Sequence, residues 1–266
     1  MVPAEAAYLI AAGVFGLLFG SFLNVCIYRI PRDLSVVFPR SFCPECGQQI
    51  AWYDNVPIVS YAILRGRCRA CARPIGLRYP FVELITASVL VLTAWRYGWT
   101  LAALKWALFE CLVIVLFWTD VEERILPDEL TLGGTVAGLL FACFVPVHAA
   151  IVEVFFGNLA VLWRSLVAST LGIVLLAGPI WGVGAIYKRV RGREGLGLGD
   201  VKLLALVGVF LGVEQGVLAL MIGAISGAGL GVLYVLITRK DMSTYELPFG
   251  SFLCLGAAIL PLLKNL

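Results

Sequence analysis

The sequence predicts an all-α polytopic membrane protein of about eight transmembrane helices with a small zinc-ribbon-like cytoplasmic domain. Three observations lead to this fold class. Of the 266 residues, 61% are hydrophobic and only 14% are charged, which is more apolar surface than a soluble domain of this length can bury. Apolar stretches near the length of a bilayer-spanning helix recur along the chain. One polar segment, which carries four paired cysteines, follows the first of these stretches.

The apolar stretches define eight expected membrane spans. Their approximate bounds are residues 7–27, 81–97, 101–118, 130–147, 166–187, 201–213, 217–237 and 248–263. Residues 1–7 contain no Lys or Arg, so they lack the basic region of a cleavable signal peptide and the first helix should be retained. We therefore expect a first transmembrane helix over 1–27, a polar domain over 28–80, and a membrane core of about seven helices over 81–266.

The distribution of basic residues predicts the orientation of these helices. The arginines between the first and second spans are Arg29, Arg32, Arg40, Arg65, Arg67, Arg69, Arg73 and Arg78. Basic loops face the cytoplasm, so this segment is expected there and the N-terminus on the outer side of the membrane. Counting helices forward places a second basic cluster, residues 188–193, on the same face, together with turns at 120–129 and 195–200. The net charge of +3 then reflects orientation in the bilayer and gives no case for nucleic-acid binding.

Two C-x-x-C pairs mark the polar domain, Cys43 with Cys46 and Cys68 with Cys71. Two tight turns at this spacing can present four thiolates tetrahedrally to Zn²⁺. The cytoplasm is reducing, so structural disulfides are not expected. Four thiolates leave no open position for water, so the metal would be structural and would stabilise a domain of turns and short strands with little apolar core. A redox dithiol or unligated thiols are the alternatives.

Two aspartates lie at the ends of expected spans and on the same expected membrane face. Asp120 ends the third span, and Asp200 opens the sixth in the sequence Gly197-Leu198-Gly199-Asp200. Charged groups near membrane depth are costly and usually functional. Peptide hydrolysis by paired carboxylates needs one ionised Asp that takes a proton from water and one protonated Asp that polarises the scissile carbonyl. Asp120 and Asp200 are therefore candidates for the catalytic pair of a membrane aspartyl protease.

The residues around this pair are also compatible with simpler roles. Gly197 and Gly199 would let a substrate backbone approach, or would adopt a positive φ beside Asp200. Asp200 and Asp128 are equally well placed to be helix N-caps, and Asp120 to be a solvated acid at the membrane surface. The local pattern leaves these alternatives open.

Further motifs accompany the cysteines and aspartates along nearly the full chain. In the first part they are Gly20, Ser21, Phe22, Leu23, Asn24, Val25, Arg29, Pro31, Asn55, Pro57, Ser60, Tyr61, residues 64–68, Arg78, Tyr79, Pro80, Val82 and Glu83. In the second part they are Leu126, Pro127 and Asp128 after Asp120, Lys202 and Leu203 after Asp200, and residues 248–253. Together they resemble the bacterial type IV prepilin peptidases, which are bifunctional leader peptidases and N-methyltransferases. Ser251 is a departure, because the resemblance predicts proline at this position.

The resemblance implies that the enzyme cuts the basic leader from type IV prepilins, or from pseudopilins of type II secretion, at the cytoplasmic face of the bacterial inner membrane. It implies that the new N-terminal residue is then methylated with S-adenosylmethionine. Asp120 and Asp200 carry over as the protease pair. The residues that support them in the matched motifs are Gly197, Gly199, Lys202 and Asp128.

The methyl-transfer site is expected next to the four-cysteine domain. No G-x-G-x-x-G motif follows a predicted strand, so a soluble-type nucleotide site is not expected. Asn24, Arg78 and Glu83 are polar residues that flank the domain, and we interpret them as framing the S-adenosylmethionine site. The alternatives are that Arg78 anchors a helix at the membrane interface and that Asn24 and Glu83 form hydrogen bonds between helices.

Two other classes of function are alternatives to a protease. A multi-helix transporter with a zinc-binding cytoplasmic module would use Asp120 and Asp200 for cation or proton transfer, and Lys105 and Glu110 within the third span favour it. A non-enzymatic assembly protein ranks lowest. The sole histidine, His148, is expected on the outer side, which argues against zinc metalloprotease and Ser-His-Asp chemistry.

Overall fold

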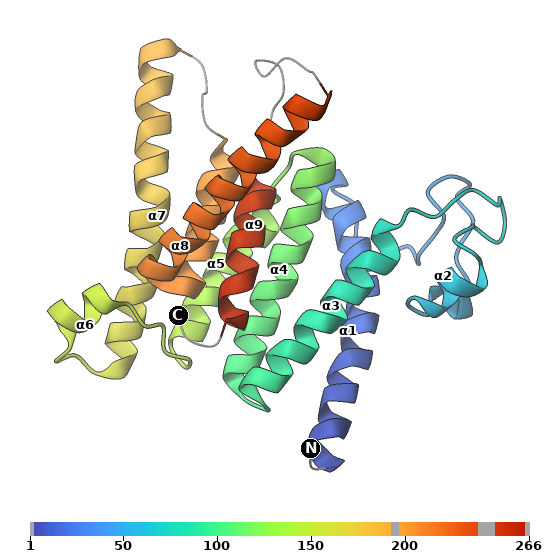
Figure 1. Cartoon of the computed structure of the whole chain (residues 1–266), viewed down its shortest axis with the longest axis horizontal. Helices are drawn as coiled ribbons and strands as arrows, with labels where there is room; N and C mark the ends of the chain where they lie inside the picture. Colours follow the sequence, from blue (N-terminus) through green and yellow to red (C-terminus); the bar gives the residue numbers. More distant parts are fainter. Residues whose placement is uncertain (1–2, 193–196, 239–247, 264–266) are drawn as a thin grey trace. The chain divides into compact units, whose positions relative to one another are not determined.

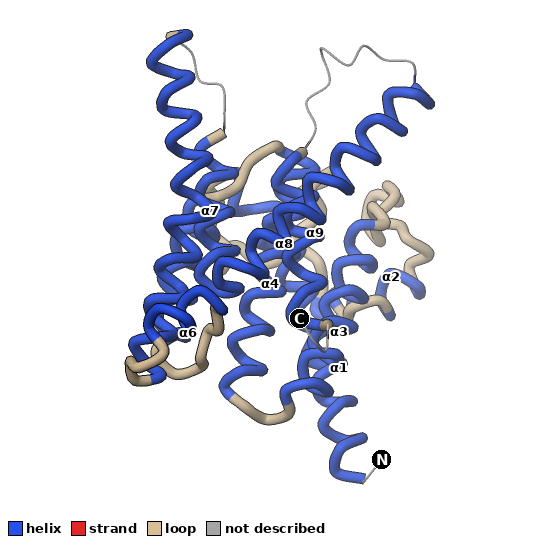
Figure 2. The backbone as a smooth tube through the Cα atoms, turned by 60° about the vertical axis from the view of Figure 1, so that its left-hand side comes forward, coloured by secondary structure: helices blue, strands red, loops and turns tan. Residues whose placement is uncertain are grey.

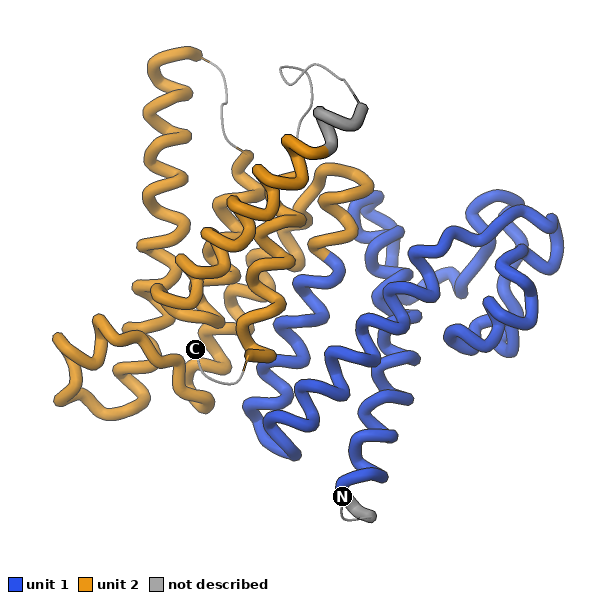
Figure 3. Tube along the Cα trace, in the orientation of Figure 1, with its two compact units in different colours: residues 1–115 blue, residues 116–266 orange. Residues whose placement is uncertain are grey.

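Helices dominate the computed structural model, which describes residues 3–192, 197–238 and 248–263. Figure 2 shows helices and loops, and no strand among these residues. The chain divides into two compact units, Met1–Val115 and Leu116–Leu266, and the boundary falls inside one helix (Figure 3). The helical membrane fold class expected from the composition is confirmed.

The first unit is built on two helices that pack through small residues. They are α1 (Pro3–Arg29) and α3 (Arg78–Tyr97), which lie side by side in Figure 1. A Cβ built on Gly16 would lie 2.5 Å from a Cα atom of α3, and one built on Gly20 would lie 2.7 Å from another. Glycine at both positions therefore lets the two backbones approach closely, as is common for helix pairs in membranes.

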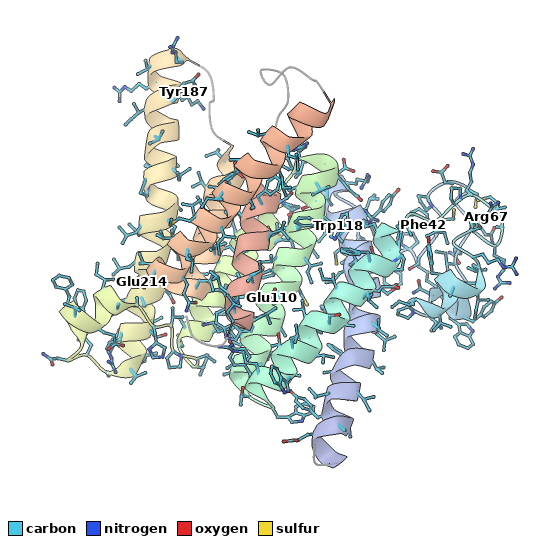
Figure 4. All side chains as sticks on the ribbon, viewed as in Figure 1. Phe42, Arg67, Glu110, Trp118, Tyr187 and Glu214 are labelled. Atoms are coloured by element: carbon cyan, nitrogen blue, oxygen red, sulfur yellow. The ribbon has the colours of Figure 1, made fainter. Side chains whose placement is uncertain are left out.

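Between α1 and α3 the chain forms a small domain of turns. Its regular elements are η1 (Ile30–Arg32), η2 (Trp52–Asn55) and α2 (Val59–Ile63). The expectation of short strands is wrong for the described residues, which form only two isolated β-bridges here, Phe42 with Gln49 and Arg67 with Pro74. Phe42 and Arg67 are labelled in Figure 4. The reason is that each C-x-x-C turn reverses the chain after a single bridge.

The second unit begins within α4 (Leu101–Glu123). Its elements are α5 (Asp128–Ala142), α6 (Ala150–Phe156), α7 (Val161–Arg191), α8 (Leu198–Thr238), α9 (Phe249–Ile259) and η3 (Leu260–Leu262). The helix α8 packs against α5, α7 and α9. Small residues again allow close approach, because Gly172 of α7 faces Gly208 of α8, and Gly256 of α9 faces Ala219 of α8.

Two features of the second unit differ from the expected elements. The helix α8 is 41 residues long and includes two expected spans, with a kink at Gly212 (φ 74°, ψ −172°) close to the expected break. The residues between the expected spans 130–147 and 166–187 contain the additional helix α6. This helix forms because Val152 is buried against Ala142, Val147 and Ala168, so one face of the segment belongs to the core.

A helix overlaps each of the eight expected spans, although α5 ends at Ala142 and the expected span at residue 147. The number of membrane crossings is not confirmed. Among the described residues, four helices are long and apolar enough to cross a bilayer, Glu5–Arg32, Leu101–Glu123, Val161–Arg191 and Leu198–Leu233. The helices α5 and α9 have 15 and 11 residues, which is shorter than the about 20 residues that a full crossing requires.

Candidate active site and four-cysteine cluster

Asp120 is buried in the last turn of α4, and its carboxylate is held by the first turn of α9. Asp120 is only 6% exposed to solvent. Its Oδ2 accepts hydrogen bonds from the Ser251 backbone N–H and from the Ser251 hydroxyl, both at 2.6 Å. Asp120 is therefore a buried acceptor in this structure, and the alternative of a solvated surface acid is wrong.

Asp200 lies in the same unit, in the first turn of α8. It is the third residue of that helix and is half-buried, so it is not the N-cap. Asp128 is the first residue of α5, after Pro127 at the N-cap position, so it is not an N-cap either. The Asp120 and Asp200 carboxylates interact electrostatically, and both also interact with the Cys254 thiol of α9. The structure thus brings the two expected aspartates together.

Leu126 packs against the glycines next to both carboxylates. A Cβ built on Gly199 would lie 3.2 Å from the Leu126 Cβ, and a Cβ built on Gly250 would lie 3.1 Å from the Leu126 Cδ1. The same Cβ on Gly250 would lie 3.1 Å from the Asp120 Oδ2. These two glycines leave the space that the Leu126 side chain and the Asp120 carboxylate occupy.

A positive φ, one of the two roles expected for the glycines before Asp200, is not found at them. Neither Gly197 nor Gly199 is among the positive-φ residues of the structure. A Cβ on Gly197 would lie 3.6 Å from the Asp200 Oδ2, which is an ordinary contact distance. The absence of a side chain, and not an unusual backbone conformation, is what these positions contribute.

Lys202 and Asp128 are joined to each other. The Lys202 ammonium of α8 donates a hydrogen bond to the Asp128 Oδ1 of α5 at 2.5 Å. This ion pair links the segment that follows Asp120 to the helix that carries Asp200. Ser251 and Gly250 were not among the expected site residues. The signals in the sequence that pointed to them were the matched segment 248–253 and its departure from proline at position 251.

The four paired cysteines come together in the first unit as expected. The sulfur atoms of Cys43, Cys46, Cys68 and Cys71 all lie within 4.8 Å of one another, and the Cys43 and Cys71 sulfurs are 4.0 Å apart. All four are free thiols. A tetrahedral metal with metal–sulfur bonds of about 2.3 Å places its sulfurs about 3.8 Å apart. The donor set and its geometry therefore fit a four-thiolate metal ion.

The two C-x-x-C segments each fold into a turn of the same kind. The Cys43 carbonyl accepts a hydrogen bond from the Gly47 N–H at 2.8 Å, and the Cys68 carbonyl accepts one from the Ala72 N–H at 2.9 Å. Gly47 and Ala72 both have positive φ, 71° and 57°. Backbone N–H groups of Cys71 and Ala70 lower the pKa of the Cys68 thiol to about 7. Such donors favour the thiolate form, which is the form that binds metal.

A cavity of about 580 Å³ adjoins the cysteine cluster within the first unit. It is lined by α1, the domain of turns and α3, and its lining includes Cys43, Cys68, Asn24 and Glu83 but not Arg78. This volume lies within the range of small-molecule sites. The structure therefore brings two of the three expected methyl-transfer residues to one cavity.

The polar residues of this cavity also form structural hydrogen bonds. The Asn24 Nδ2 donates to the Tyr79 carbonyl at 3.0 Å, which links α1 to α3, and the Glu83 Oε2 accepts from the Ile58 N–H at 2.8 Å. The Asn24 Oδ1 is buried and has no hydrogen-bond partner among the described residues. The Arg78 guanidinium lies 4.7 Å from the centroid of the Tyr79 ring. Asn24 therefore forms the hydrogen bond between helices that was the alternative to a role in methyl transfer. Its Oδ1 remains available as an acceptor.

The fold and the site define a helical membrane protein with a carboxylate pair in one unit and a four-thiol cluster in the other. Residues 14–97 match the model of the Bacterial Peptidase A24 N-terminal domain, and residues 107–232 match that of the Type IV leader peptidase family. The chain belongs to the type IV leader peptidase family, which confirms the resemblance.

Several curated relatives are similar over most of their length, and each is named prepilin leader peptidase/N-methyltransferase. The Pseudomonas putida protein is 35% identical over 278 residues, which are 96% of this chain and 91% of the relative. The Aeromonas hydrophila protein is 34% identical over 273 residues, 92% of this chain and 87% of the relative. The Legionella pneumophila protein is 32% identical, with 94% and 89% covered. No solved structure matches the chain significantly.

Family membership replaces the transporter alternative. Lys105 and Glu110, the residues that favoured it, are 1% and 0% exposed in α4, and Glu110 is labelled in Figure 4. The Lys105 ammonium lies 4.7 Å from the centroid of the Trp106 ring. Burial of charged side chains in a membrane helix is compatible with either class, so these residues do not separate the two.

Proposed function

We propose that this chain cleaves the leader peptide of prepilins with Asp120 and Asp200, and then N-methylates the new N-terminal residue with S-adenosylmethionine. Both activities rest on membership of the type IV leader peptidase family and on the names of the relatives. The observation that supports the residue assignment is that one side chain, Leu126, packs against Gly199, next to Asp200, and against Gly250, beside the Asp120 carboxylate. The two carboxylates also interact electrostatically.

The proposed cleavage uses the two carboxylates in different protonation states. Two carboxylates that interact directly favour a state in which they share one proton. The ionised aspartate accepts a proton from water while the water oxygen bonds to the scissile carbonyl carbon, and the protonated aspartate donates its proton to the carbonyl oxygen. The C–N bond of the tetrahedral intermediate then breaks as the leaving nitrogen takes a proton from the pair. The segment around Asp200 would be positioned by the Lys202–Asp128 ion pair. Close packing beside Asp200 would be allowed by Gly197 and Gly199, which have no side chain.

We assign residues 28–80 as a structural zinc domain and residues 81–266 as the protease core. Cys43, Cys46, Cys68 and Cys71 would bind one Zn²⁺, and the closeness of their sulfurs supports this. Four thiolates leave no coordination position for water, so the ion would stabilise the turns and would take no part in cleavage.

The cavity beside this domain is the proposed site for S-adenosylmethionine. This donor supplies the methyl group, and it carries a cationic sulfonium centre that a carboxylate such as Glu83 would attract. The unpartnered Asn24 Oδ1 would accept a hydrogen bond from it. Tyr79 also lines the cavity, so Arg78, which stacks on the Tyr79 ring, would act on the site through that ring.

The proposed location is the bacterial inner membrane, with the N-terminus in the periplasm and both sites at the cytoplasmic face. The basic residues between the first two spans support this orientation. The proposed substrates are prepilins of type IV pili or pseudopilins of type II secretion. Their basic leader would lie in the cytoplasm and their apolar helix in the bilayer, so the scissile bond would reach the membrane surface.

The test is cleavage of a purified prepilin by the full chain in detergent. Asp120→Asn and Asp200→Asn should each lower cleavage by roughly 10²- to 10⁴-fold, because each removes one acid–base partner. Glu129→Gln, a change at an exposed carboxylate in the same unit, should leave cleavage unchanged. Methyl transfer to an already cleaved pilin should persist in both aspartate variants. Normal cleavage by either aspartate variant would refute the pair.

A further inference from the structure

Ser251 is the third residue of α9, so its backbone N–H has no acceptor within the helix. The buried Asp120 carboxylate of α4 is its acceptor, at 2.6 Å. The Ser251 hydroxyl lies 2.6 Å from the same oxygen and 3.3 Å from the Phe117 carbonyl. A hydroxyl has one proton to donate, and the shorter distance identifies Asp120 as its acceptor.

Both of these hydrogen bonds fall on Oδ2 of Asp120. Two donors occupy the two lone pairs of one carboxylate oxygen, so Oδ2 cannot also carry a proton. The O–H···O distance of 2.6 Å matches that of a charge-assisted hydrogen bond to an ionised oxygen. A proton shared by the carboxylate pair can therefore sit on Oδ1 of Asp120 or on Asp200.

We propose that Ser251 is a positioning residue that holds Asp120 through Oδ2 and leaves Oδ1 as the oxygen that takes the proton from water. This inference rests on the proposed function of Asp120 in cleavage. Oδ1 can take that proton only if it carries none, so the proposal places the shared proton on Asp200, which then polarises the scissile carbonyl. A proline at position 251 has neither an N–H nor a hydroxyl, so it would hold the carboxylate by other means or not at all.

The experiment compares Ser251→Ala, Ser251→Thr and Ser251→Pro in the prepilin cleavage assay. The alanine variant keeps the N–H and loses the hydroxyl, and its kcat should fall roughly 10- to 100-fold with KM unchanged, as expected for a lost bond to a charged group. The threonine variant restores the hydroxyl and should recover most of kcat. The proline variant loses both donors and should lose more than the alanine variant. Ser226→Ala is the matched control, because the Ser226 hydroxyl donates only to the Gly223 carbonyl of its own helix.

Three outcomes decide the inference. A wild-type kcat in Ser251→Ala overturns it, as does a loss that appears in KM alone. If Ser251→Ala also loses methyl transfer to cleaved pilin, the threonine variant decides, because recovered kcat supports the positioning role and absent recovery overturns it. Asp120→Asn in the same assay distinguishes a failure of the proposed function from a failure of the inference about Ser251. If that variant cleaves normally, the proposed function fails; if it is inactive while Ser251→Ala is normal, only this inference fails.

Discussion

Lys202 of α8 donates a hydrogen bond to Asp128 of α5, and so joins two residues that lie close in sequence to the two proposed catalytic aspartates. The side chains of Lys202 and Asp128 are 29% and 57% exposed, so the ion pair is partly screened by solvent. Pairs of this kind contribute about 0–1 kcal/mol. The pair therefore orients the two segments without being a large source of stability.

Replacing either member of this pair should have a small, reversible effect. Asp128→Asn or Lys202→Met should lower cleavage by up to about 5-fold, which corresponds to about 1 kcal/mol. The charge exchange Asp128→Lys with Lys202→Asp should recover much of the loss, because it restores the attraction. Cleavage rates of the three variants provide the measurement. A loss above about 100-fold in one single variant would mean that this residue takes part in the chemistry directly.

The Gly250→Ala variant should impair cleavage. Its Cβ would lie 3.1 Å from both Cγ and Oδ2 of Asp120 and from the Leu126 Cδ1, so the carboxylate must move. We expect kcat to fall at least about 10-fold, because small displacements of catalytic groups are costly. The control is Gly229→Ala on α8, where a Cβ meets nothing within 4 Å. That variant should cleave normally and gain about 0.5–1 kcal/mol in helix stability. Equal activity in both variants would show that a Cβ at position 250 does not displace the Asp120 carboxylate.

The four-cysteine cluster should bind one zinc ion per chain. Elemental analysis of the purified protein should find this metal, and Cys68→Ser with Cys71→Ser should remove it, because two thiolate ligands are lost. The doubly substituted protein should lose methyl transfer and keep cleavage. Cys143→Ser is the control, since Cys143 lies at the exposed end of α5 and outside the cluster. Intact methyl transfer together with failed cleavage would show that the cluster serves the other activity.

Residues of the 580 Å³ cavity should determine the affinity for S-adenosylmethionine. Asn24→Ala removes the unpartnered amide oxygen, and Glu83→Gln removes the negative charge but keeps an acceptor for the Ile58 N–H. Each should weaken binding roughly 5-fold, the cost of about one hydrogen bond. Calorimetric titration with S-adenosylmethionine measures this. Ser88→Ala, at an exposed hydroxyl of α3 bonded within its own helix, should bind normally. Unchanged affinity in both cavity variants would place the site elsewhere.

Local spacing in the sequence was sufficient to predict the helices and the cysteine cluster. Apolar stretches of the right length predict helices, and a helix overlaps each of the eight expected spans. Two C-x-x-C pairs predict two tight turns, and the four sulfurs meet as expected. These features follow from short-range geometry, because residues a few positions apart are placed by the backbone itself. The number of membrane crossings is less accessible, since short helices such as α5 and α9 depend on the neighbours that cover them.

The surroundings of the aspartates could be known only from tertiary packing. Ser251 is 131 positions away from Asp120 in the chain, yet its two donors hold the Asp120 carboxylate. The sequence shows Ser251 as a departure from an expected proline, and it cannot show which oxygen the hydroxyl reaches. The sequence likewise does not show that Gly250 and Gly199 make room for the Leu126 side chain, as they do in the fold. Such contacts join helices distant in sequence, so they are set by how α4, α8 and α9 pack and not by any local pattern.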